Sequence, residues 1–175
     1  MTEVILVNEK DLQTGTMEKM EAHVKGLLHR AFSIFIFNSK GEFLLQQRAL
    51  DKYHNGGIWS NTCCSHPLPG ESILNAANRR LFEEMGFSTA LSPAFNFIYN
   101  ANFSNGLTEY EYDHVFTGIY DGEIKADKSE VNDYCFKKIA DIESSIETHP
   151  QKYSEWFKIA LPQVKLFHDV KFNLL

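Results

Sequence analysis

Residues 71–87 read ESILNAANRRLFEEMGF, a stretch that predicts one amphipathic helix with a defined end. Its apolar residues recur at helical spacing: Leu74, Ala77, Leu81 and Met85. Gly86 follows directly, at the position where a glycine in the left-handed conformation commonly ends a helix. We therefore expect a helix from Glu71 to Met85 in the middle of the chain.

Strands dominate the sequence on both sides of this helix. Runs of β-branched and aromatic residues bounded by turn residues predict strands at Val4–Asn8, Ala31–Phe37, Phe43–Gln47, Ile58–Cys63, Phe95–Phe103, Glu109–Tyr120 and Tyr134–Lys138. Two closing helices are expected at Ile139–Glu147 and Lys152–Leu161, and Pro162 should break or kink the second. This order favours an α+β fold, an α/β/α sandwich of mixed sheets. Residues 1–175 show no linker or repeat, so we expect a single domain.

The composition excludes several classes of function. The 175 residues carry a formal net charge of −6, whereas a general nucleic-acid surface needs clustered lysine and arginine. No apolar run is long enough for a membrane span, and the N-terminus does not resemble a signal peptide. The cysteines, two of them adjacent at Cys63 and Cys64, do not form a secreted disulfide pattern. We therefore expect a cytoplasmic protein. A small anionic substrate can still bind where metal ions and a few basic residues reverse the local charge.

Three short segments concentrate side chains that bind metals. They offer three imidazoles and two carboxylates, a set that suits Mn²⁺, Mg²⁺ or Zn²⁺: His23, His29, His66, Glu109 and Glu111. Residues two apart in a strand face the same side, so Glu109 and Glu111 could reach one ion, with Cys64 beside it. Each signal is weak alone, because alternating carboxylates commonly form the solvent face of a strand. A lone cysteine is likewise usually a small buried apolar residue.

The central helix and the loop before it resemble the Nudix box. That pattern is a glycine, a glutamate, then Arg-Glu-hydrophobic-any-Glu-Glu-any-Gly-hydrophobic, and here it runs from Ser65 to Gly86. In that family the box forms a loop–helix–loop whose glutamates hold a metal on a diphosphate. Two positions depart from the pattern, since Ser65 replaces the glycine and Arg80 replaces a glutamate. A cation at position 80 argues against hydrolysis and suits holding a diphosphate.

Simple helix stabilisation is the alternative explanation for this charge cluster. Arg79 with Glu83, and Arg80 with Glu84, have the i,i+4 spacing of ion pairs on a helix. Base before acid is the weaker orientation of such a pair, however. Pairing alone therefore explains the cluster poorly.

Further motifs make the resemblance more specific, to the type I isopentenyl-diphosphate isomerases of the Nudix superfamily. The matching segments lie between Val4 and Phe157 in the family's order: Thr14–Lys19, Leu28–Ser33, Gln47–Ala49, Trp59–Pro67 and Gly70–Ser72. The resemblance implies an enzyme of isoprenoid biosynthesis that converts isopentenyl diphosphate into dimethylallyl diphosphate. Protonation of carbon-4 would give a tertiary carbocation, and loss of a proton from carbon-2 would complete the reaction.

The resemblance also implies roles for individual residues. Cys64 and Glu111 would exchange the two protons, in an order that the sequence leaves open, with Tyr99 bonded near the acid and Trp156 over the cation. Four cations would hold the diphosphate: Lys19, Arg48, Lys52 and Arg80. A Mg²⁺ on the diphosphate would be held by Glu84. A second divalent metal, Mn²⁺, Mg²⁺ or Zn²⁺, would be bound by His23, His29, His66, Glu109 and Glu111.

Three competing interpretations remain at this point. A Nudix hydrolase would explain the helix glutamates but not Cys64, His66 and Trp156 together. A non-catalytic Nudix-like binding module should have lost the acid–base pair, and a structural zinc protein would need a closed ligand set. For the isomerase we expect a small diphosphate as the only partner, neither nucleic acid nor membrane, and a monomer or weak homodimer. Cys63 should face away from Cys64.

Overall fold

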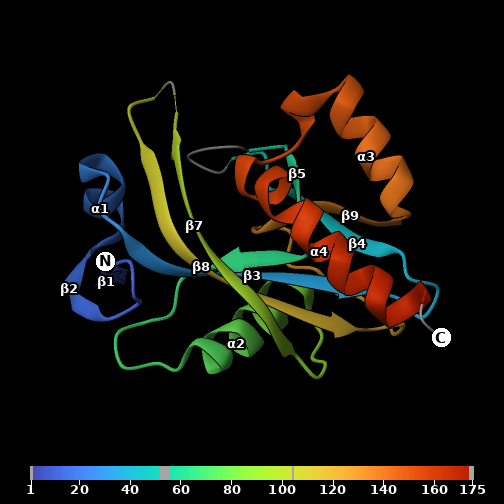
Figure 1. The fold of residues 1–175 in the computed structure, drawn as a ribbon, viewed down its shortest axis with the longest axis horizontal. Helices are drawn as coiled ribbons and strands as arrows, with labels where there is room; N and C mark the ends of the chain where they lie inside the picture. Colours follow the sequence, from blue (N-terminus) through green and yellow to red (C-terminus); the bar gives the residue numbers. More distant parts are fainter. Residues whose placement is uncertain (1, 52–55, 104, 174–175) are drawn as a thin grey trace.

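The computed structural model describes residues 2–51, 56–103 and 105–173, and its strands form one mixed sheet (Figure 1). The strands are β1 (Glu3–Val7), β2 (Gln13–Glu18), β3 (His29–Phe37), β4 (Phe43–Arg48), β5 (Trp59–Ser60), β6 (Cys63–Ser65), β7 (Ser92–Asn102), β8 (Thr108–Ile119) and β9 (Val131–Lys137). The helices are α1 (Lys19–Lys25), α2 (Ile73–Met85), α3 (Ile139–Thr148), the 3₁₀ turn η1 (Pro150–Lys152) and α4 (Glu155–Asn173). The expected α+β sandwich is confirmed.

Strand β3 is the centre of the sheet. Along one edge it pairs in parallel with β8 over its whole length, from His29 opposite Glu111 to Phe37 opposite Ile119. Along the other edge it pairs in turn with β1, β6 and β4, all antiparallel. Residues from β6 and β8 therefore flank β3 on either side.

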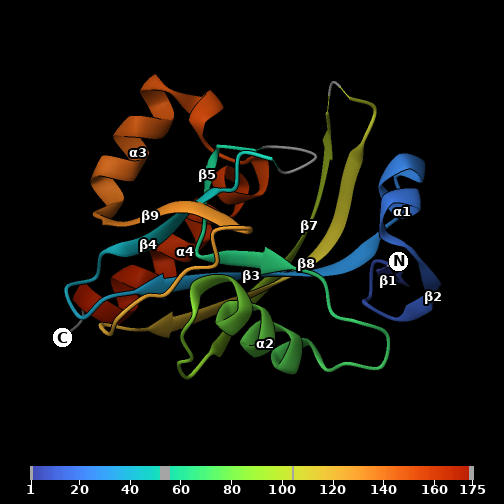
Figure 2. The ribbon, with the colours of Figure 1, turned by 180° about the vertical axis from the view of Figure 1, so that it is seen from behind.

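The two faces of the sheet carry separate apolar clusters, because strand side chains alternate between faces. Phe35 and Phe37 of β3 pack with α3 and α4, whereas Ile34 and Ile36 pack with α2. Figures 1 and 2 show α2 apart from α3 and α4, with the sheet between them. The hairpin formed by β7 and β8 projects from the rest of the sheet and lies between α1 and α3 in both views (Figures 1 and 2). No helix in the described part of the chain is long and apolar enough to cross a membrane.

Helix α2 ends as its sequence indicates. The Ser72 side chain caps its start by accepting a hydrogen bond from the N–H of Asn75, 3.3 Å away. Gly86 ends it in the left-handed region, at φ 73°. A side chain there would also collide with the carbonyl of Lys125. Glycine is thus required at this position for two independent reasons.

Three sequence predictions need correction. The segment 13–25 forms β2 and α1, neither of which was expected. The single strand Ile58–Cys63 is wrong: it is split into β5 and β6. The side chains of Asn61 and Thr62, between the two strands, instead donate hydrogen bonds to the backbone carbonyl oxygens of Ile34, Cys63 and Leu44. The last helix begins later than expected and continues through Pro162 to Asn173. Its apolar face, packed on the sheet, outweighs the one backbone hydrogen bond that proline removes.

Candidate active site

A cavity opens on the α4 face of the sheet and collects side chains from seven elements. Its lining comes from α1, β3, β4, β6, β7, β8 and α4, together with His66 after β6. The residues are Lys19, His23, Ser33, Arg48, Cys64, Ser65, His66, Tyr99, Glu109, Glu111 and Trp156. Segments more than a hundred residues apart in the sequence thus meet at one place.

Three histidines and one carboxylate form a compact group, and three of its four members also line this cavity. One ligand atom from each of His23, His29, His66 and Glu111 lies within 4.8 Å of the others. Nε2 of His66 is 2.9 Å from Oε1 of Glu111, and Nε2 of His29 is 3.4 Å from the same oxygen. Glu109 lines the cavity nearby but does not belong to this compact group.

The geometry of the imidazoles suits metal binding. Nδ1 of His23 lies 2.6 Å from the carbonyl oxygen of Lys19, and Nδ1 of His29 lies 2.8 Å from that of Leu27. Donation from Nδ1 to a carbonyl leaves the Nε2 lone pair for an ion, as in many metal sites. Nε2 of His29 is buried without a hydrogen-bond partner. Burial lowers the pKa of His23 to about 4 and that of His66 to about 3, so both are neutral at pH 7, the form that binds metals.

The carboxylates beside this group respond differently to burial. Burial, followed by the nearby charge of Glu111, raises the pKa of Glu109 to about 8. Burial also opposes ionisation of Glu111, but the His29 and His66 rings hold its pKa well below the usual value. The Tyr99 hydroxyl donates to Glu111 at 2.6 Å and lies 3.3 Å from Glu109. Glu111 is therefore the charged member of the pair, and Tyr99 fixes one of its oxygens.

The adjacent cysteines occupy opposite faces of β6, as expected. Cys64 lines the cavity and contacts the cluster under α4. Cys63 is fully buried in the cluster under α2. Burial raises the pKa of both thiols, so each is protonated at neutral pH. Only Cys64 is in a position to meet a ligand in the cavity.

Trp156 is buried at the start of α4 and held by one buried amide. Its Nε1–H donates to Oδ1 of Asn61 at 3.1 Å. The same amide donates through Nδ2 to the carbonyl oxygens of Ile34 and Cys63. Asn61 therefore ties the indole on α4 to the strand that carries Cys64. Asn61 lies within the matching segment Trp59–Pro67, but no role was assigned to it from the sequence.

Of the three predicted cations that lie within the described residues, Lys19 and Arg48 reach the cavity. Lys19 lines it from α1, and burial lowers the pKa of its amine. Arg48 lines it from β4 with its guanidinium carbon 5.6 Å from the centre of the Trp156 ring. Its Nε is buried without a hydrogen-bond partner. Lys52 lies outside the described residues.

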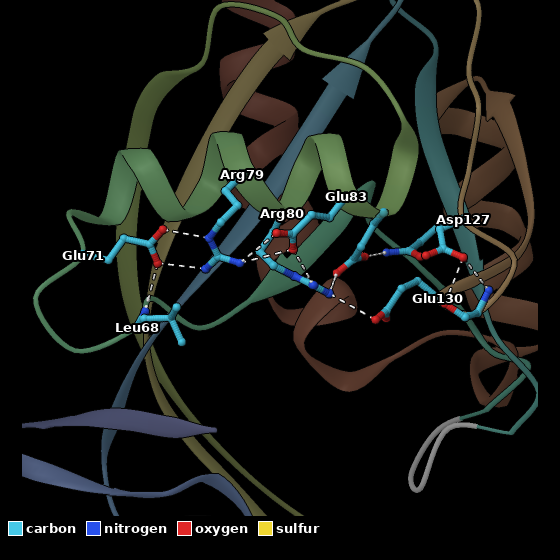
Figure 3. Close-up of polar contacts among 10 residues, drawn as sticks. Leu68, Glu71, Arg79, Arg80, Glu83, Asp127 and Glu130 are labelled. Carbon is cyan, nitrogen blue, oxygen red and sulfur yellow. Dashed lines mark hydrogen bonds and ion pairs between the residues drawn. The ribbon is translucent and has the colours of Figure 1, made fainter. Parts of the chain in front are cut away.

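Arg80 and Glu84 lie on α2, and neither belongs to the cavity lining. Nη2 of Arg80 is 2.6 Å from Glu84, and Nη1 is 2.7 Å from Glu83. Figure 3 shows Arg80 also directed towards Glu130, with a separation of 3.4 Å. Glu84 accepts a further hydrogen bond from Gln46. The structure thus places Arg80 among carboxylates.

The i,i+4 pairs considered from the sequence do form, but longer-range contacts accompany them. Arg79 lies 3.2 Å from Glu83 and binds Glu71 through two bonds of 2.8 Å (Figure 3). Glu71 in turn accepts from the N–H of Leu68. These contacts anchor the loop before α2 to the helix itself, so the cluster does more than stabilise isolated turns.

Three polar residues in or behind the cavity wall, Ser33, Ser65 and Asp113, were given no role at the site from the sequence. Ser33 and Ser65 line the cavity, and Ser33 donates to the buried Asp113 at 2.7 Å. Burial, then the charge of Glu111, raises the pKa of Asp113 well above its usual value. The alternation Glu109, Glu111, Asp113 along β8 was the available signal, since all three share one face.

The chain is similar to known proteins in both sequence and fold. Residues 27–158 match the model of the NUDIX domain. An isopentenyl-diphosphate Delta-isomerase of Pectobacterium atrosepticum is 49% identical over 164 residues, covering 94% of this chain and 92% of that protein. The enzyme of the same name from Burkholderia multivorans is 45% identical, covering 93% of each. A crystal structure of a Deinococcus radiodurans protein has the same fold, with a TM-score of 0.70 at 16% identity over 84% of this chain and 90% of that one.

Proposed function

Since this chain belongs to the NUDIX family, and within it to the isopentenyl-diphosphate Delta-isomerases, we propose that its cavity interconverts isopentenyl and dimethylallyl diphosphate by proton addition and removal. The observation that carries the proposal is that Cys64, Glu111, Tyr99 and Trp156 line one cavity. They reach it from β6, β8, β7 and α4. An acid, a base and an aromatic face are what an alkene shift through a carbocation needs.

Cys64 and Glu111 are the two groups that exchange protons with the substrate. They project from β6 and β8, the strands on either side of β3, so an alkene above β3 would lie between them. Carbon-4 gains a proton from one group, and carbon-2 loses a proton to the other. Tyr99, bonded to Glu111 at 2.6 Å, holds that carboxylate in place.

The intermediate carries its positive charge on carbon-3. The indole of Trp156 offers the negative face of its ring system, which stabilises a desolvated cation by about 2 kcal/mol. An aromatic face has no lone pair with which to trap the cation. The hydrogen bond from Trp156 to Asn61 holds the ring in position.

The diphosphate binds outside the proton-transfer site. Lys19 and Arg48 extend into the cavity, and Lys52 and Arg80 would complete the clamp. Glu84 would hold a Mg²⁺ ion on the diphosphate. Arg80 and Glu84 are bonded to each other, so a magnesium diphosphate would replace this ion pair with one bond from each residue to the ligand.

His23, His29, His66 and Glu111, with Glu109 beside them, would hold a second divalent ion, Mn²⁺, Mg²⁺ or Zn²⁺. A bound ion supplies positive charge that lowers the proton affinity of a carboxyl group. The chain's own contribution is to keep His23 and His66 neutral by burial and to bring one ligand atom of each imidazole together. We also propose that the protein acts in the cytoplasm, where its three free cysteines remain reduced, as a monomer or weak homodimer.

Turnover in heavy water tests the proposal. Purified protein is incubated with isopentenyl diphosphate and Mg²⁺ in D₂O, and the product is analysed by mass and NMR. We expect dimethylallyl diphosphate with deuterium in the methyl group formed from carbon-4. Release of phosphate without that product would instead indicate a NUDIX hydrolase and would refute the proposal.

A further inference from the structure

A buried polar pair adjoins the cavity and has no part in the proton transfers described above. Ser33, in the middle of β3, donates its hydroxyl proton to Oδ2 of Asp113 at 2.7 Å. Both residues are 1% exposed. Oδ1 of Asp113 is buried without a hydrogen-bond partner. Burying a carboxyl group with only one oxygen satisfied destabilises a fold, so the pair calls for a functional explanation.

The sheet register places Ser33 beside the proton-transfer site. Ser33 is the direct antiparallel partner of Cys64, and such partners project to the same face about 5 Å apart. Two residues further along β3, Phe35 belongs to the apolar cluster. The Ser33 hydroxyl is thus a polar group in the cavity wall, at the boundary with the apolar core.

The hydrogen bond fixes the direction of the hydroxyl dipole. Ser33 lines the cavity, whereas Asp113 is not part of the lining. The O–H bond therefore points into the wall, and the oxygen lone pairs remain for the cavity. This orientation holds when Asp113 is ionised and when its proton is on Oδ1, because Ser33 donates to Oδ2.

We propose that Ser33 is a further catalytic residue, whose oxygen, oriented by Asp113, stabilises the cationic carbon of the intermediate. A dipole fixed before the reaction needs no reorganisation when the charge appears, which is the basis of electrostatic preorganisation. Ser33 and Trp156 then present two negative surfaces to the same cation. This role rests on the proposed isomerase function.

Ligands that differ only in charge at carbon-3 test this role. One probe is the substrate analogue whose tertiary carbon is replaced by a protonated tertiary amine. The other is isopentyl diphosphate, which is saturated and uncharged at that position. We expect Ser33→Ala to weaken binding of the ammonium analogue about tenfold or more while leaving binding of isopentyl diphosphate unchanged. In the same variant kcat should fall by a similar factor at nearly constant KM.

Two further variants separate this role from a structural one. Ser33→Thr keeps the hydroxyl and should retain the preference for the charged ligand. Ser145→Ala removes a hydroxyl that accepts from Tyr153 at 2.9 Å, outside the cavity lining, and should change neither affinity. Equal weakening of both ligands by Ser33→Ala, or no weakening, would overturn the inference while the wild-type enzyme still makes dimethylallyl diphosphate. A wild-type protein that makes none would overturn the proposed function itself, and the inference with it.

Discussion

Cys63 and Cys64 are adjacent in sequence but lie on opposite faces of β6. Cys64 faces the cavity, and Cys63 packs under α2. A strand turns successive side chains through half a circle, so the two thiols have unrelated surroundings despite their identical chemistry. This pair is therefore an internal control for the role of the thiol.

Replacing Cys64 with alanine should abolish most of the activity. The change removes one proton-transfer group but leaves the imidazoles and the cations in place, so kcat should fall by a factor of about 100 or more. Cys64→Ser should do little better, because a hydroxyl is a much weaker acid than a thiol. Steady-state kinetics with isopentenyl diphosphate would measure both effects.

Cys63→Ala is the matched control. Its side chain is fully buried, so we expect a loss of about 1 kcal/mol in the free energy of unfolding and nearly unchanged kcat. The reverse pattern, with Cys63→Ala inactive and Cys64→Ala active, would show that the proton-transfer role has been given to the wrong thiol. Full activity in both variants would exclude a thiol from the mechanism.

Arg80 distinguishes diphosphate binding from diphosphate hydrolysis. Arg80→Glu would restore the residue that Nudix hydrolases have at this position. It would also add a carboxylate beside Glu83, Glu84 and Glu130. We expect loss of isomerase activity with no release of phosphate, because the diphosphate would meet an anion in place of a cation.

The neighbouring reversal, Arg79→Glu, controls for damage to α2. It breaks the bonds from Arg79 to Glu71 and should lower the melting temperature while most of the activity remains. Colorimetric phosphate assays on both variants would show whether either one hydrolyses the diphosphate. Phosphate release by Arg80→Glu would contradict the role given to Arg80.

At the scale of elements, the Nudix loop–helix–loop depends on glycines for two distinct reasons. Gly70, before α2, and Gly86, after it, both have positive φ, at 81° and 73°. Nothing lies within 4 Å of a side chain added at Gly70. At Gly86 such a side chain would meet the backbone of Lys125. Position 70 therefore needs only a permissive backbone, whereas position 86 also needs space.

Alanine at these two glycines should destabilise the protein unequally. Gly70→Ala should cost about 1 kcal/mol, from the left-handed conformation alone. Gly86→Ala should cost about 2–3 kcal/mol or more, because the Lys125 segment must also shift. Thermal unfolding would compare the two variants, because each kcal/mol of lost stability lowers the melting temperature by about 2–4 °C in a chain of this length. Equal melting temperatures of the two variants would show that the close contact between position 86 and the backbone of Lys125 does not affect stability.

At the scale of the whole molecule, a bound ion should link activity to stability. The histidines come from α1, β3 and the segment after β6, and Glu111 from β8. An ion held by all of them would bind the folded state alone, so it would raise the melting temperature.

Chelation should therefore remove both properties together. After exhaustive dialysis against EDTA we expect loss of isomerase activity and a lower melting temperature, and both should return when Mn²⁺ or Mg²⁺ is added. Calorimetry and kinetics on the same samples would measure the two effects. Full activity in metal-depleted protein would rule out a metal requirement.

The central helix and the long strands could be predicted because their patterns are local. The spacing of Leu74, Ala77, Leu81 and Met85 and the glycine that follows are enough to specify α2. Strand β2 and helix α1 were missed because 13–25 lacks a strong apolar period and is held mainly by pairing with β1. The prediction that Pro162 breaks the last helix was wrong for a similar reason. The packing of α4 on the sheet, which keeps the helix continuous, is not apparent from the sequence of the helix alone.

The sequence by itself determined the family, the helix α2 and the residue types of the site, because motifs are matched by order and spacing along the chain. Only the tertiary structure decided which of those residues meet. Register across β3 places Ser33 beside Cys64 and His29 beside Glu111. The packing of α2 places Arg80 against carboxylates of the same helix, and Arg80 is not part of the cavity lining. The physical reason is that pairing between strands and packing between layers join distant segments, and no local spacing specifies such contacts.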